Sequence, residues 1–198
     1  MTLAELIAEV YTLTNRPDRV AETLAAVRSA TLKAHQSDYY FKDLFEVGLS
    51  FSIVDYVQNF DYRAAIPLWR SLKYLRKYDV VAGVGTEGTE LEIIVPENVF
   101  DEYKIEKTDV CYGAGAYIQI KSSTKQQFYL LGCYVNPNIT QAAYSSWVAL
   151  DHPYYIIFDA AATVFKAIGK DDEAAAYRTM MSEQLAMLRA SNILANGF

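Results

Sequence analysis

The sequence predicts an α+β fold in which N-terminal and C-terminal helical hairpins form one helical bundle with an inserted antiparallel β-sheet or sandwich. Apolar residues recur at helical spacing near both ends of the chain, and alternate at strand spacing between them. Glycine and proline residues separate the alternating runs. We therefore expect a bundle of residues 1–38 and 139–198 and a β-rich domain of residues 39–138.

The first hairpin is read from two apolar stripes. Thr2 and Glu5 form a capping-box pattern at the start of a helix over residues 2–14. A second helix is expected to run from Asn15 to about His35, with Asn15 as its cap and Pro17 in its first turn. The inward stripes are Leu3, Leu6, Ile7, Val10 and Leu13, then Val20, Leu24, Val27 and Thr31.

The central part predicts several short strands. Residues 49–55 alternate with a period of two, which is typical of a strand with one buried face. Residues 67–78 fit a helix or a strand, and we favour the strand. Residues 80–90 contain three glycines and predict a loop or hairpin tip. The other expected strands are 91–95, 110–112, 116–121 and 127–135, with a short helix or turn over 96–103.

The last third is helical again. Asp151 and Pro153 are expected to start a helix over residues 154–168 that is apolar almost all round. A domain of this size rarely buries such a helix completely, so a partner subunit is expected to cover it. Gly169 suits the end of this helix, and acidic residues start the final one. The inner face of the final helix is Tyr177, Met181, Leu185 and Leu188.

Composition and charge restrict the function classes. Hydrophobic residues make up 52% of the chain, yet its apolar stretches are short and broken by charge, so no membrane span is expected. The start of the chain reads as a helix and not as a signal peptide. The net charge is −6 without a basic arm, which disfavours gripping nucleic acid phosphates. Sixteen tyrosines favour interfaces and sugar-binding surfaces alike.

The sequence contains no convincing cofactor or metal motif. Cys111 and Cys133 lie in apolar, strand-like runs and are expected to be buried free thiols. His35 and His152 are too far apart in sequence to indicate a metal cluster. Residues 83–88 fit G-x-G-x-x-G, but the flanking strand and helix of a nucleotide site are missing, and glutamates surround the motif.

The sequence also contains no motif that identifies catalytic side chains. Asp151 and His152 lie near Ser145 and Ser146, which permits a hydrolase hypothesis, but a helix-entry turn explains the same residues. His35 is expected to end a helix, where an imidazole suits the dipole. A cluster of acids is typical of a solvated face: Glu97, Asp101, Glu102, Glu106 and Asp109. The sequence therefore predicts a protein that is not an enzyme.

One basic cluster is a candidate subunit interface. It is either a mixed-charge strand face or a patch that meets an acidic neighbouring subunit, and the sequence supports both equally. The cluster is Arg70, Lys73, Arg76 and Lys77.

Several runs along the chain are informative together: residues 3–7 and 12–18, residues 30–35 followed by 38–41, residues 70–76, residues 144–147, residues 152–154, residues 160–161 and residues 168–169. In this order they resemble tailed-bacteriophage head-to-tail connector adaptor proteins of the podovirus-like kind. The resemblance spans nearly the whole chain, and it rests on the order of the runs, because none is a catalytic signature.

The resemblance implies a structural virion protein of the neck, assembled in the host cytoplasm. It implies a ring, usually of twelve subunits, that lies beneath the portal protein, contacts tail or nozzle proteins and surrounds the DNA exit channel without sequence-specific binding. In such adaptors the C-terminal segment reaches the portal. Here that segment is uncharged after Arg189, and its candidate portal-binding residues are Leu188, Ile193, Leu194 and Phe198.

A second hypothesis is a tail-associated carbohydrate- or receptor-binding module. Trp69 or Trp147 would then serve as a stacking platform, together with tyrosines. Two helical hairpins are an unusual frame for such a module, so the adaptor hypothesis is favoured.

Overall fold

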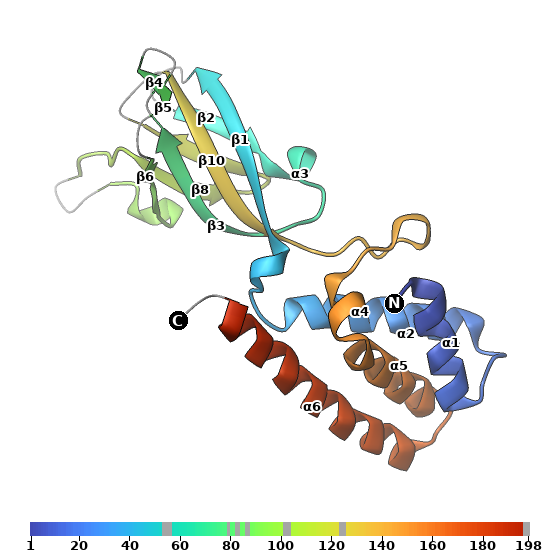
Figure 1. The fold of residues 1–198 in the computed structure, drawn as a ribbon. Coiled ribbons are helices and arrows are strands. Elements are labelled where there is room, and N and C mark those ends of the chain that lie inside the picture. The colour runs from blue at the N-terminus through green and yellow to red at the C-terminus, as the bar shows by residue number, and fades with distance from the viewer. Residues whose placement is uncertain are drawn as a thin grey trace. The chain divides into compact units, whose positions relative to one another are not determined.

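The computed structural model describes residues 1–52, 57–78, 80–81, 84–85, 88–100, 104–122 and 126–195. The chain divides into a helical unit, residues 1–43 and 136–198, and a β-unit, residues 44–135 (Figure 1). The α+β class is confirmed. The expected boundaries shift by a few residues, because Tyr40 is buried in the helical core and Asp43 bonds to His35.

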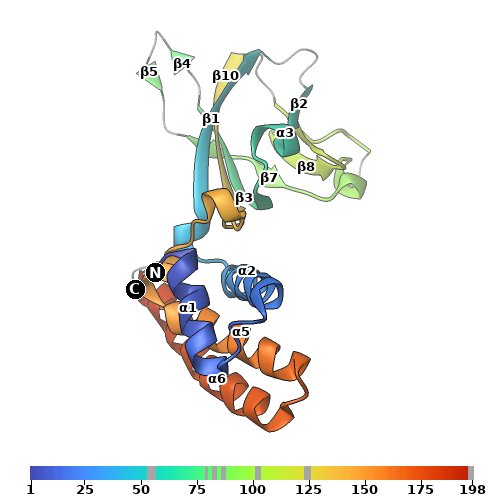
Figure 2. The same cartoon turned by 90° about the vertical axis from the view of Figure 1, so that its right-hand side faces the viewer.

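The helical unit contains elements from both ends of the chain. Figure 2 shows α1, α2, α5 and α6 gathered in this unit. Its elements are α1 (Leu3–Thr14), α2 (Val20–Gln36), η1 (Phe41–Asp43), η3 (Gln141–Ala143), α4 (Trp147–Asp151), α5 (Pro153–Ala167) and α6 (Asp171–Ala195).

The helix ends confirm some capping predictions and correct others. Thr2 and Glu5 form the expected capping box at α1. Asn15 was wrongly expected to start the second helix; its left-handed backbone, with φ of 51°, ends α1 instead, and α2 begins only at Val20. Asp151 was expected to cap the helix that begins at Pro153, but it is the last residue of α4. The N-cap position of α5 is occupied by His152 instead. Gly169, with φ of 75°, follows α5 as predicted.

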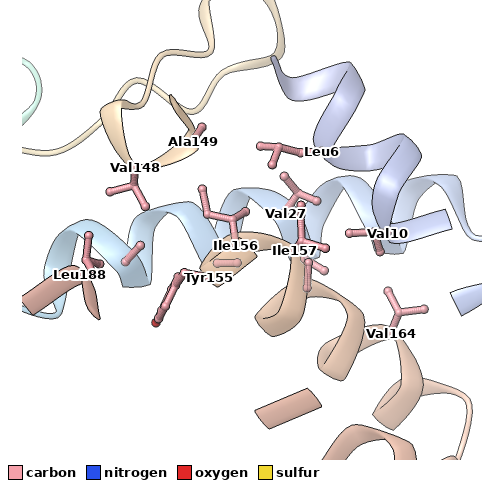
Figure 3. Close-up of a cluster of buried hydrophobic side chains, with 14 of the residues drawn as sticks. Leu6, Val10, Val27, Val148, Ala149, Tyr155, Ile156, Ile157, Val164 and Leu188 are labelled. Atoms are coloured by element: carbon pink, nitrogen blue, oxygen red, sulfur yellow. The ribbon is translucent and has the colours of Figure 1, made fainter. Parts of the chain in front are cut away.

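The core of the helical unit lies around α5. Figure 3 shows Leu6 and Val10 of α1, Val27 of α2 and the α5 side chains converging on one cluster. Ile156 and Ile157 are fully buried there. The predicted partner subunit over this helix is therefore not needed, because α1, α2, α4 and α6 of the same chain pack against α5.

The β-unit contains two four-stranded sheets, with strand orders β1-β10-β3-β6 and β2-β9-β8-β7. Residues 69–78 of the ambiguous run form a strand, as favoured, and all described pairs are antiparallel except the short parallel pair β7 and β8. The strands are β1 (Leu44–Ser52), β2 (Val57–Asp61), β3 (Trp69–Tyr78), β4 (Val80–Val81), β5 (Val84–Gly85), β6 (Thr89–Glu90), β7 (Glu92–Ile93), β8 (Val110–Ala114), β9 (Tyr117–Lys121) and β10 (Gln126–Val135).

Several short elements of the β-unit differ from the predictions. The expected strand at 49–55 begins earlier, at Leu44, and residues 53–56 lie outside the described residues. The strands β4 and β5 pair as a small hairpin, in keeping with the hairpin tip expected there. The turn at 96–103 begins with a 3-10 helix, η2 (Pro96–Asn98). The helix α3 (Tyr62–Ala65) was not predicted; Asp61 caps it by accepting a hydrogen bond from the Ala64 amide.

The two sheets bury a common apolar cluster. Leu75 and Leu131 come from one sheet, and Cys111 and Ile120 from the other; all four are fully buried. On β10, Gly132 pairs with Tyr74, and the Tyr74 ring lies where a Cβ at Gly132 would be. The glycine thus lets an aromatic ring lie flat against the strand.

Candidate functional site

The predicted portal-binding residues lie in or after α6. This helix continues to Ala195, so the segment from Leu188 does not leave the helix where the sequence suggested. Leu188 is fully buried in the core of its own chain, which removes its side chain from any partner surface (Figure 3). Ile193 and Leu194 belong to α6, but their side chains, like all of Phe198, lie outside the described residues.

The side of α6 that faces away from this core is exposed. We call it the outer face of α6: Ala175, Ala176, Thr179, Met180, Glu183, Ala186, Met187 and Ala190. Met180 and Met187 are 45% and 58% exposed. The inner face agrees with the prediction, because Tyr177, Met181, Leu185 and Leu188 contact the chain's own apolar clusters. The small outer side chains allow another helix to approach closely.

A buried polar network joins three elements of the helical unit. His35 at the end of α2 lies with Nδ1 2.7 Å from Asp43 Oδ1 and with Nε2 2.9 Å from Ser146 Oγ. The three residues are only 2%, 4% and 8% exposed. The indole of Trp147 donates to the same Asp43 oxygen at 2.7 Å.

The acceptor character of Asp43 fixes one hydrogen-bond direction in this network. A carboxylate only accepts, so His35 donates from Nδ1 to Asp43, and Nε2 shares a hydrogen bond with the Ser146 hydroxyl. This order of serine, histidine and aspartate is also that of a hydrolytic triad. The hydroxyl oxygen of Ser146, however, also accepts from the Ala149 amide as the cap of α4. Together with its burial, this favours a structural role in fixing α2, η1 and α4.

The sequence did not predict this network. Proximity along the chain suggested Ser146 with His152, whereas the fold brings Ser146 to His35, 111 positions away. The available signal was that His35 falls on the buried side of α2 with Thr31. A buried histidine needs polar partners, but the sequence does not say which ones.

Of the residues in the hydrolase hypothesis, Asp151 and His152 line a surface pocket of about 430 Å³ beside Trp147. Ser145 and Ser146 line a different pocket, beside Met1 and Leu150. Asp151 pairs with Lys42 at 2.6 Å and is not the partner of His152. His152 Nε2 lies 3.4 Å from Ser191 Oγ, whose hydroxyl donates to the Leu188 carbonyl at 2.7 Å. Neither contact prepares a nucleophile, because the histidine does not accept the serine proton.

The four basic side chains on β3 differ in their exposure and in the groups that they contact. Lys77 is 9% exposed and pairs with Asp109 at 2.8 Å, so its charge is neutralised within the β-unit. Arg76 is exposed, lies over the Tyr74 ring and is 3.7 Å from Glu90. Lys73 lies over the Tyr134 ring. Arg70 is half-buried and lines a pocket with Trp69.

The acidic residues expected on a solvated face are partly engaged. Glu106 pairs with Lys121, whose pKa is lowered by burial, and Asp109 accepts from both Lys77 and Ser122. Asp101 and Glu102 lie outside the described residues, as do Gly83, Thr86 and Glu87 of the glycine motif. The pockets beside Trp147 and Trp69 contain one carboxylate between them, that of Asp151.

The cysteines are buried free thiols, as predicted. Burial raises the pKa of Cys111 to about 12 and that of Cys133 to about 11, which disfavours the reactive thiolate. Among the described residues, no group of three or more histidine, cysteine, aspartate or glutamate side chains is arranged to hold a metal ion. None of the helices within the described ranges has the length and apolar character needed to cross a membrane.

No protein-family model matches the chain, and no curated protein matches it.

Proposed function

We propose that the chain is a non-enzymatic structural protein of a tailed-bacteriophage virion, a head-to-tail adaptor that assembles as a ring beneath the portal. The ring, of twelve subunits by resemblance, would link the head to tail or nozzle proteins and surround the path of the DNA. The order of the sequence runs that resemble such adaptors supports this role. In the structure, the outer face of α6 is the single observation that carries it.

The outer face suits a subunit or portal contact for two reasons. Met180 and Met187 place exposed, flexible apolar side chains on a helix of 25 residues. The surrounding alanines have short side chains, so a partner helix can approach this face closely. The chain's own core already occupies the inner face of α6, and the outer face would contact another chain.

The charge of the chain agrees with a passive role toward DNA. A net charge of −6 repels phosphates, so DNA would slide past the ring without being held. DNA would then pass without sequence-specific binding, and the protein would lie in the neck of the virion after assembly in the host cytoplasm.

Sedimentation of the full-length protein, alone and with the portal protein of the same virion, tests the proposal. We expect a defined complex with the portal, and Met180→Lys with Met187→Lys should abolish it while the monomer stays folded. The matched control is Val20→Lys. Val20 was wrongly expected on the inward stripe of α2; it is the first residue of that helix and is 60% exposed, away from the outer face of α6. A wild-type chain that stays monomeric with the portal would refute the adaptor role.

A further inference from the structure

A pocket of about 420 Å³ lies in the β-unit where α3 leads into β3; both elements are labelled in Figure 2. Its size is in the range of small-ligand pockets. The lining residues are Tyr62, Arg63, Ile66, Pro67, Trp69 and Arg70. It belongs to neither the buried network nor the outer face of α6.

Two aromatic rings form one wall of this pocket. The centroids of Tyr62 and Trp69 are 4.5 Å apart with an interplanar angle of 34°. The Tyr62 hydroxyl donates to the Gly115 carbonyl at 2.9 Å, and both rings pack against the core between the sheets. The wall is therefore held in place before any ligand arrives. The apolar face of a sugar ring can pack against such aromatic rings, because the contact removes apolar surface of both from water.

The charged groups of the pocket are two guanidiniums. Arg63 comes from α3 and is exposed, and Arg70 comes from β3 and is half-buried. Planar guanidiniums bind carboxylates through paired hydrogen bonds, which gives direction as well as charge. We infer that the pocket binds a sugar residue that carries a carboxylate, such as a uronic or sialic acid within a glycan.

A single acidic sugar fits better than a nucleic acid. Residues 44–135 contain twelve acidic and nine basic side chains, so the β-unit repels a continuous run of phosphates. The pocket has the volume for one or two sugar rings, whereas single-stranded nucleic acid binders use an extended basic groove. A glycan whose charge lies on one residue avoids that repulsion.

Nuclear magnetic resonance of the ¹⁵N-labelled full chain tests the inference through the indole signal of Trp69, assigned with Trp69→Phe. The probes are glucuronate, galacturonate and N-acetylneuraminate, with glucose, galactose and acetate as matched controls. We expect at least one acidic sugar to shift the Trp69 signal, with about tenfold weaker binding of neutral sugars. Acetate should leave the signal unchanged, because it lacks the ring that packs on the aromatic wall.

Arg63→Gln and Arg70→Gln should each weaken that binding by about fivefold or more, since each removes a charge-assisted contact. Arg178→Gln, an exposed arginine of α6, is the control and should bind like the wild type. Three results overturn the inference: none of the acidic sugars shifts Trp69, neutral sugars bind as tightly, or a single-stranded oligonucleotide binds the same pocket more tightly. All leave the adaptor proposal intact, because portal assembly is measured separately.

Discussion

Nδ1 of His35 lies 2.7 Å from Oδ1 of Asp43, and both side chains are almost completely buried. The pair joins the end of α2 to the last residue of the helical unit before β1. Hydrogen bonds of this kind are stronger away from water, and leaving one partner alone is correspondingly costly. Its removal should therefore affect stability more than an exposed pair would.

Asp43→Ala should lower the free energy of unfolding by about 3 kcal/mol, because the His35 ring and the Trp147 indole would both lose their acceptor. Urea unfolding followed by far-ultraviolet circular dichroism measures this effect, since the long helices all belong to the helical unit. Glu183→Ala on the exposed side of α6 is the control and should change stability by less than about 0.5 kcal/mol. An equal effect of the two substitutions would contradict the structural role of the network.

Leu188→Ala and Met187→Ala test which face of α6 is buried and which is exposed. Leu188 is fully buried, so its truncation should cost about 2–5 kcal/mol of stability, whereas Met187 is 58% exposed and its truncation should cost little. Urea unfolding of both variants gives the difference. Comparable losses for the two would mean that the inner face of α6 is assigned wrongly.

Gly132→Ala should destabilise the β-unit by about 1–3 kcal/mol. The new Cβ would lie 2.5 Å from Cζ of the buried Tyr74 ring, which has little room to move. Gly113→Ala on β8 is the matched control, because a Cβ added there would meet nothing within 4 Å and alanine restricts the unfolded chain. Calorimetry of the full chain should show a loss for the first variant only.

The carboxyl of Asp18 should titrate with a pKa of about 2, because the Arg16 side chain hydrogen-bonds to its charged form. A lowered folded-state pKa stabilises the fold above the ordinary value of 3.8, and this contribution disappears as the pH falls toward about 2. Asp18→Asn should therefore make unfolding less dependent on pH in that window. Carbon-detected magnetic resonance gives the pKa, and in Arg16→Gln it should return toward 3.8.

Much of the architecture could be predicted from local patterns. The α1 capping box, Gly169 after α5 and the inner stripe of α6 each depend on residues within a few turns of one another. The start of α2 could not be predicted in this way. Asn15 and Pro17 suit either the end of one helix or the start of the next, and the left-handed backbone at Asn15 decides between them.

The candidate sites were harder to predict from the sequence, because their residues come from distant parts of the chain. Ser146 and His152 are neighbours in sequence, yet Ser146 bonds to His35. Lys77 belongs to a basic run, yet it is buried against Asp109, 32 positions away. Pairing of this kind depends on strand register and helix packing, which a one-dimensional pattern does not contain.

The order of amino acids was sufficient for the α+β class, the helical ends and the β-rich centre, because side-chain periodicity and caps are local properties. Only the tertiary structure showed which helices bury α5, because α1, α2 and α6 must fold back onto it. Packing also made Leu188 a core residue and brought Trp69 into a pocket with Tyr62 and two arginines. These relationships arise when whole elements meet in three dimensions, and no local pattern records which elements will meet.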